Sequence, residues 1–182
     1  IVFTLGSAYV YEHKEMGRVV ANCHKLPGHV FNKRLLTIEE IVKAYSSITN
    51  LFSGKQVIFT VSPVRHWRDG AMENQRSKSI LIEAVHQLIS LNSNTHYFPA
   101  YEIMMDELRD YRFYEEDMLH PNKVAVKYIW KRFGATYFEE NTVHINQRID
   151  KINNLLQHRI KHPNTKEQRD FLAFTAKSIE TF

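Results

Sequence analysis

Gln56-Val57-Ile58-Phe59-Thr60-Val61-Ser62 is a run of β-branched and aromatic residues between a turn at Gly54 and the proline at position 63. Such a run, bounded by turn residues, is typical of a strand that is buried on both faces of a parallel sheet. Ile1-Val2-Phe3-Thr4-Leu5 has the same character. The sequence therefore predicts two buried parallel strands, one at residues 1–5 and one at residues 56–62.

Helical periodicity follows each of these strands. Residues 37–40, Thr-Ile-Glu-Glu, have the spacing of a capping box, and apolar residues recur after them at helical intervals as far as Tyr45. Residues 80–89 repeat the helical pattern before a third, weaker strand at residues 95–98. The alternation of strand and helix implies right-handed crossovers and a doubly wound α/β layer.

Further helices are predicted after the third strand. Between residues 101 and 108, apolar side chains recur at helical spacing, and we expect Arg109, Asp110 and Arg112 to form ion pairs. Pro121 suits the first turn of a helix that continues to Phe133.

The last part of the chain differs from the α/β part. Residues 142–160 and 165–182 each have one apolar face. We interpret them as a helical extension, packed on the domain or available to another subunit. The predicted division is a domain at 1–138 and an extension at 139–182.

Composition excludes several classes of protein. Of the 182 residues 43% are hydrophobic, which suits a compact globular domain. The 24 Lys and Arg residues exceed the 20 Asp and Glu residues by four and are spread along the chain, so a nucleic-acid partner is not predicted. No apolar run reaches the roughly 20 residues that span a bilayer. A single cysteine leaves the cellular compartment undecided.

The sharpest chemical pattern is Asp117-Met118-Leu119-His120-Pro121, an acid three residues before a histidine. A carboxylate placed in this way can accept a hydrogen bond from one ring nitrogen while the other nitrogen faces a nucleophile. On the pattern alone, the alternative is a helix-capping acid beside a surface histidine.

Three further segments stand beside the Asp117 to Pro121 segment: Asn22-Cys23-His24-Lys25, Ser62-Pro63-Val64-Arg65-His66, and YEIMMDELRDYRFY at residues 101–114. Together these segments resemble the GSCFA family, and the resemblance extends from residue 1 to about residue 138. The family is similar to SGNH/GDSL hydrolases. This resemblance implies a flavodoxin-like three-layer α/β/α sandwich with a parallel sheet, here followed by the helical extension. It also implies a serine triad in which Asp117 is the orienting acid and His120 the general base.

The nucleophile of that triad is missing from this sequence. The family's naming motif, Gly-Ser-Cys-Phe-Ala, would supply the serine, and no such string occurs here. We expect the motif upstream of Ile1. In the flavodoxin-like strand order, residues 1–5 would have a neighbouring strand on each side. We therefore expect an upstream segment or another molecule to cover this strand, because an open edge tends to pair.

Gly6 and Ser7 invite a second interpretation, since a serine after a strand-ending glycine looks like a nucleophile elbow. The G-x-S-x-G pattern is absent, and the family position matches the block that contributes to the oxyanion hole. Ala8 stands where that block usually has asparagine. The oxyanion donors are then Asn22 or backbone amides near Gly6 and Ser7.

Arg65 and His66 follow the carboxyl end of the second strand, where open α/β sheets bind their ligands. A guanidinium there could bind an acidic substrate group or brace a carboxylate, and an ion pair with Asp69 or another acid on the same loop is an equal alternative. Asn22 and His24 are candidates through the resemblance, with a hydrogen-bonded hairpin as the alternative. The histidines lack metal-ligand spacing, so neither a metal nor another cofactor is predicted.

The leading hypothesis is a serine esterase that removes an acetyl or short acyl group from a small molecule or carbohydrate. Two rivals stay open: a catalytically inactive binding or scaffold domain, and an acyltransferase with the same triad. Self-association is expected through the edge of residues 1–5 or through the C-terminal helices.

Overall fold

The computed structural model describes residues 1–21, 23, 25–52, 54–157 and 165–180. Contacts divide the chain into two compact units, Ile1–Ile129 and Trp130–Phe182. The predicted division after residue 138 stays a prediction.

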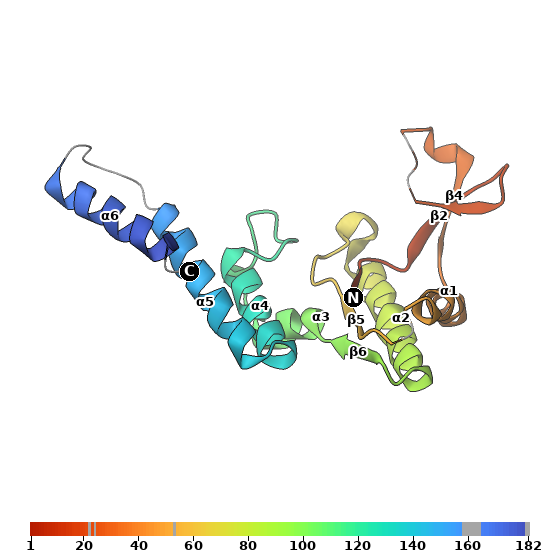
Figure 1. Ribbon diagram of the computed structural model, residues 1–182. Coiled ribbons are helices and arrows are strands. Elements are labelled where there is room, and N and C mark those ends of the chain that lie inside the picture. Colours follow the sequence, from red (N-terminus) through yellow and green to blue (C-terminus); the bar gives the residue numbers. More distant parts are fainter. Residues whose placement is uncertain (22, 24, 53, 158–164, 181–182) are drawn as a thin grey trace. The chain divides into compact units, whose positions relative to one another are not determined.

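The first unit is built around a parallel sheet with the strand order β1-β5-β6 (Figure 1). These strands are Val2–Leu5, Val57–Val61 and Thr95–Phe98, and β5 pairs in parallel with both neighbours. The three predicted strands are thus confirmed, and their order is that of the last three strands of a flavodoxin-like sheet.

Helices α1 (Ile38–Asn50) and α2 (Gly70–Leu91) pack against each other and cover one face of the sheet (Figure 1). The capping box of α1 is confirmed: Thr37 Oγ1 accepts from the backbone N–H of Glu40, and the Glu40 carboxylate accepts from the N–H of Thr37. The core beneath the helices is apolar and contains Leu5, Ile41, Val57, Phe59, Val61, Leu81, Ala84, Val85 and Leu88.

The other face of the sheet is covered at β5 and β6. Ile58 and Thr60 of β5 are buried there, and α3 (Ala100–Glu102) contacts this strand. The helical turn continues as the π-helix η3 (Ile103–Glu107), in which Ile103 and Met104 are buried. The chain therefore forms the predicted α/β/α arrangement. The predicted ion pairs are present as Arg109 with Asp106 and Arg112 with Asp110.

One prediction about β1 is wrong. Phe3 and Leu5 face the core, but Val2 is 50% exposed and Thr4 is also exposed, so the strand is not buried on both faces. Val2 and Thr4 point to the face that α3 covers at β5, and β1 lies outside β5 as the outer strand among the described residues. The expected covering segment stays a prediction.

A second sheet was not predicted. Strands β2 (Tyr9–His13), β3 (Arg18–Val20) and β4 (Phe31–Leu35) form an antiparallel sheet in the order β3-β2-β4, between β1 and α1 in the sequence. The short 3₁₀ helix η1 (Gly28–Val30) precedes β4. Gly17, with φ +60°, ends the β2–β3 turn and donates to His13 O at 2.8 Å. A side chain at this position would strain the left-handed backbone.

The remaining elements run from η2 (Trp67–Asp69) and η4 (Tyr111–Phe113) to the C-terminal helices α4 (Lys123–Tyr137), α5 (Glu140–Leu156) and α6 (Lys166–Glu180). Helix α4 begins after Asn122, not at Pro121 as predicted, because the Asn122 side chain caps it.

Within the second unit, α5 and α6 contact each other. Trp130, Phe133 and Phe138 form an aromatic cluster, and a Cβ at Gly134 would lie 3.1 Å from the Phe138 ring. Large apolar side chains of α5 and α6 stay exposed, among them Leu156 and Phe174. No helix in the described part of the chain is long and apolar enough to cross a membrane.

Candidate functional site

The Asp117-His120 segment lies on a closed loop between η4 and α4. An antiparallel bridge between Tyr114 and Pro121 closes its base, and Glu115 N donates to His120 O at 2.8 Å. At the tip, Met118 has φ +58°, a left-handed conformation that is uncommon for a residue with a side chain. The loop therefore holds a defined shape through its own backbone.

Asp117 and His120 form a direct side-chain pair in this loop. Nδ1 of His120 lies 2.5 Å from Oδ2 of Asp117. The other carboxylate oxygen, Oδ1, accepts from the backbone N–H groups of Leu119 at 2.8 Å and of His120 at 3.0 Å. Both oxygens of the acid are thus used to fix the histidine.

These bonds determine the charge of the pair. The backbone N–H groups of His120 and Leu119, followed by the His120 ring, lower the pKa of Asp117 from 3.8 to about 2. An ionised carboxylate only accepts hydrogen bonds, so the proton in the 2.5 Å contact belongs to Nδ1. In the neutral ring this leaves Nε2 as the acceptor nitrogen.

The pair is open to solvent. The side chain of His120 is 57% exposed and that of Asp117 is 44% exposed. No described residue forms a hydrogen bond with Nε2 of His120. A hydroxyl group from another segment or from a ligand can therefore reach this nitrogen.

Arg65 ties the end of β5 to the Asp117-His120 loop. Its backbone N–H donates to Leu119 O at 3.2 Å, and its Nη1 donates to Met118 O at 3.4 Å. The guanidinium lies 4.3 Å from the centre of the Tyr114 ring. The alternative of an ion pair with Asp69 is wrong, because Arg65 has no carboxylate partner in the described part of the chain.

His66 points into a different group of side chains. Its Nε2 lies 3.4 Å from Oδ2 of Asp69, and its ring stacks on Tyr9 of β2. Lys33 of β4 forms an ion pair with Asp69 and holds the pKa of this carboxyl group below its usual value. Arg65 and His66 are adjacent in sequence but contact different parts of the protein. Arg65 contacts the His120 loop, and His66 contacts the second sheet through Tyr9.

Gly6 and Ser7 follow the carboxyl end of β1. Ser7 Oγ lies 3.3 Å from Ser77 Oγ and accepts from the N–H of Tyr9 at 3.1 Å, so this hydroxyl is engaged in the turn. The N–H of Ala8 donates to Ser77 Oγ at 2.7 Å. The N–H groups of Gly6 and Ser7 have no acceptor among the described residues, whereas that of Ala8 does.

A buried lysine joins the carboxyl ends of β1 and β5. Nζ of Lys78 donates to Gly6 O and to Ser62 O, both at 2.7 Å, and the residue is only 1% exposed. Burial lowers the pKa of Lys78 from 10.5 to about 8. Our sequence analysis missed Lys78 and Ser77, because a polar residue within a helix gives no sign of which strand ends it will meet.

Asn22 and His24 lie outside the described residues. No group of histidine, cysteine and acidic side chains suited to a metal ion occurs in the part of the chain that the structure describes.

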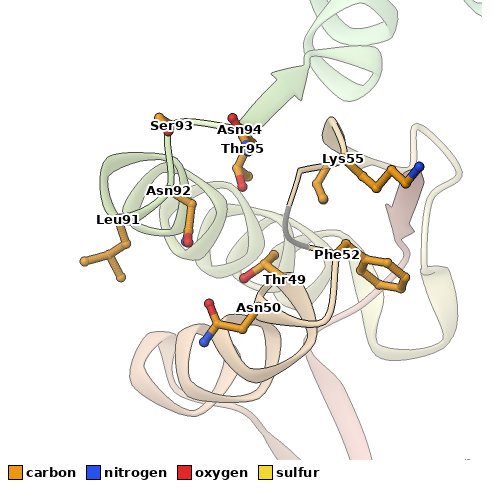
Figure 2. A pocket seen from close by; sticks show the side chains of 10 residues that line it. Thr49, Asn50, Phe52, Lys55, Leu91, Asn92, Ser93, Asn94 and Thr95 are labelled. Carbon is orange, nitrogen blue, oxygen red and sulfur yellow. The ribbon is translucent and has the colours of Figure 1, made fainter.

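Two hollows lie at different distances from the carboxyl ends of the parallel strands. One, of about 280 Å³, is lined by Thr49, Asn50, Phe52, Lys55 and Leu91–Thr95, together with Val57 (Figure 2). Val57 and Thr95 are the first residues of their strands, so this hollow lies at the amino ends of the sheet, opposite the edge where such sheets bind ligands. The other is lined in part by Asp117, Met118 and Leu119 and lies beside the His120 loop.

Comparison with known proteins identifies the family of the chain. The GSCFA family profile matches residues 1–133. The chain belongs to the GSCFA family. The match includes β1, the second sheet, the Arg65 segment and the Asp117-His120 loop. No curated protein and no solved structure matches the chain.

Proposed function

We propose that this GSCFA-family chain carries the acid and base of a serine esterase of the SGNH type. The observation that supports this most directly is the 2.5 Å contact between His120 Nδ1 and an Asp117 carboxylate that two backbone N–H groups also hold. The pair has the orientation that a nucleophile-activating base requires, with Nε2 exposed.

In the proposed reaction, Nε2 of His120 removes the proton from a serine hydroxyl as this oxygen attacks the ester carbonyl. Asp117 stabilises the imidazolium that forms and keeps Nδ1 protonated. His120 then gives its proton to the leaving alcohol, which leaves an acyl-enzyme. Water, activated by the same nitrogen, releases the acid and restores the serine.

The serine would come from a Gly-Ser-Cys-Phe-Ala segment upstream of Ile1, since this string is absent from the 182 residues. Ser7 is a poor substitute, because its hydroxyl already contacts Ser77 and Tyr9 within the turn. The N–H groups of Gly6 and Ser7, which have no acceptor among the described residues, are our candidates for binding the oxyanion, since that of Ala8 donates to Ser77.

The proposed substrate is an acetyl or short acyl ester, with a carbohydrate as a suitable carrier. Water is the acceptor in this proposal, and an acyltransferase with the same triad would differ only in the acceptor of the acyl group.

The test uses a protein that includes the Gly-Ser-Cys-Phe-Ala segment, with p-nitrophenyl acetate as substrate. We expect His120→Ala and Asp117→Asn each to lower kcat/KM by about a thousandfold or more. His144→Ala is the matched control, because His144 is also an exposed histidine beside an acid, Glu140 at 3.7 Å, but lies on α5.

Unchanged turnover in both dyad variants would remove the proposed roles. A serine that does not react with a fluorophosphonate probe in the intact protein would instead favour a binding or scaffold domain. Transfer of the acyl group to an added alcohol faster than to water would identify an acyltransferase.

A further inference from the structure

The hollow beside the His120 loop has a composition that suggests a ligand. It has a volume of about 370 Å³ and is lined by Arg65, Trp67, Tyr111, Asp117, Met118 and Leu119. The last three belong to the loop that ends at His120, so a ligand in this hollow would lie next to the proposed base. A volume of this size suits one sugar ring with its substituents.

Arg65 brings unused hydrogen-bond donors to the hollow. A guanidinium has five N–H donors, and one of them, on Nη1, has an acceptor among the described residues, Met118 O at 3.4 Å. Its positive charge has no carboxylate partner there. Such a fork is suited to bind a carboxylate or a phosphate through two parallel hydrogen bonds.

The remaining walls are aromatic and exposed. The residues Trp67 and Tyr111 are 48% and 62% exposed, and their rings lie 5.9 and 5.4 Å from the Arg65 guanidinium. Aromatic faces of this kind can cover the apolar face of a sugar ring while its hydroxyl groups stay in water. Met118, 48% exposed, adds a flexible apolar contact.

Asp117 is the one acid in the lining, and both of its oxygens already accept hydrogen bonds within the loop. Oδ1 already accepts two backbone hydrogen bonds, and Oδ2 accepts from the His120 ring. Arg65 is therefore the charged group that is available to a ligand in this hollow.

We propose that this hollow is a substrate subsite for an acidic carbohydrate, in which Arg65 binds the anionic group and Trp67 with Tyr111 contact the ring. This inference rests on the proposed function: the acidic sugar would carry the acyl ester that the serine, His120 and Asp117 hydrolyse. The anionic group is a carboxylate, as in a uronic acid, or a phosphate.

The test observes binding without turnover, on the 182-residue chain. The protein has two tryptophans, Trp67 and Trp130, so the two indole N–H signals of a ¹⁵N-labelled sample report on the hollow and on the second unit. Trp67→Phe assigns the signals. We expect glucuronic acid or glucose 6-phosphate to shift the Trp67 signal. Glucose, the neutral control, should bind at least about tenfold more weakly. The comparison of the two acids distinguishes carboxylate from phosphate.

Variants of the walls complete the test. Arg65→Met should weaken binding of the acidic sugar about tenfold or more, whereas Arg68→Met, which removes an exposed charge from the same segment outside the lining, should leave it unchanged. Tyr111→Ala keeps the bond between Arg65 and Met118 and should also weaken binding.

Equal binding of glucose and the acidic sugars, or full binding by Arg65→Met, would overturn the subsite. The outcome for the subsite can be distinguished from the outcome for the proposed esterase activity. Retained binding with an inactive full-length protein removes the proposed function alone, and an active esterase without selectivity for acidic sugars removes the subsite alone.

Discussion

Asp117 performs two tasks with two different oxygens. Oδ1 accepts the N–H groups of Leu119 and His120 and so determines the path of the backbone, while Oδ2 orients the imidazole. The hydrogen bonds from the backbone to Oδ1 do not involve the His120 ring. A variant that lacks the ring therefore tests whether the backbone alone keeps Asp117 ionised.

We expect the pKa of Asp117 to stay below its usual value in His120→Ala. The backbone N–H groups of residues 119 and 120, which are the largest contributions to the value of about 2, are retained in this variant. Since the pKa is lower in the folded protein, the stability contributed by Asp117 is present above the unfolded value of about 3.9 and is lost as the pH falls through about 2. A titration of the Asp117 Cγ signal by NMR measures both proteins. A midpoint of 3.8 or higher in the wild type would contradict the geometry of the loop.

Lys78 should also make stability rise with pH, but in the alkaline range. Its pKa is about 8 in the folded protein and 10.5 when exposed, so its charge opposes folding below pH 8, and stability rises as the pH increases between these values. The rise amounts to about 3 kcal/mol for a shift of this size. The unfolding free energies of the wild type and of Lys78→Met are measured in urea at pH 7 and pH 10. The difference between the two proteins isolates Lys78, because all other titrating groups are present in both. A difference that does not change with pH would show that Lys78 is not desolvated.

At the scale of elements, prediction from sequence succeeded where the relevant contacts are local. The capping box of α1 and the pair of Asp117 with His120 each join residues three apart. At this separation, the spacing in the sequence is enough to predict the contact. Lys78 meets Gly6 from 72 positions away, and no periodicity reports such a contact. The role of Arg65 in holding the loop was missed for the same reason.

The antiparallel sheet escaped prediction for a different reason. Its strands are short and hold few buried side chains; in β2 every residue is only partly buried. The alternation of apolar and polar residues that marks a half-buried strand is therefore weak. Gly17, flanked by Tyr9–His13 and Arg18–Val20, was the available signal of a hairpin.

Asn122 links the start of α4 to the His120 loop, and this link can be tested against another cap. Its Oδ1 accepts from Val124 and Ala125, and its Nδ2 donates to Arg112 O at 2.7 Å. We expect Asn122→Ala to lower the unfolding free energy by about 1–2 kcal/mol and to shift the His120 ring signals. Thr37→Ala, which removes the cap of α1, should cost about 1 kcal/mol and leave these signals in place. Urea unfolding and NMR measure the two effects. Unshifted His120 signals in the Asn122 variant would show that the loop keeps its shape without this cap.

At the scale of the whole molecule, the family match and the first compact unit cover almost the same part of the chain. The match ends at residue 133, and the first compact unit ends at Ile129. Helices α5 and α6 lie beyond both limits. Their exposed apolar side chains are consistent with the predicted self-association, which stays a proposal.

The open edge of β1 leads to the last prediction. Ile1 O and Leu5 O accept from β5, so odd-numbered residues of β1 direct their backbone groups toward β5 and Val2 and Thr4 direct theirs outward. In the 182-residue chain at low concentration, we expect the amides of Val2 and Thr4 to exchange with solvent deuterium much faster than those of Phe3 and Leu5. In a protein that includes the Gly-Ser-Cys-Phe-Ala segment, a further strand should protect Val2 and Thr4, because an apolar edge beside a buried strand favours pairing. Phe59 of β5, buried in both proteins, is the internal reference. Equal exchange of Val2 and Thr4 in the two proteins would mean that the neighbouring strand of β1 does not come from that segment.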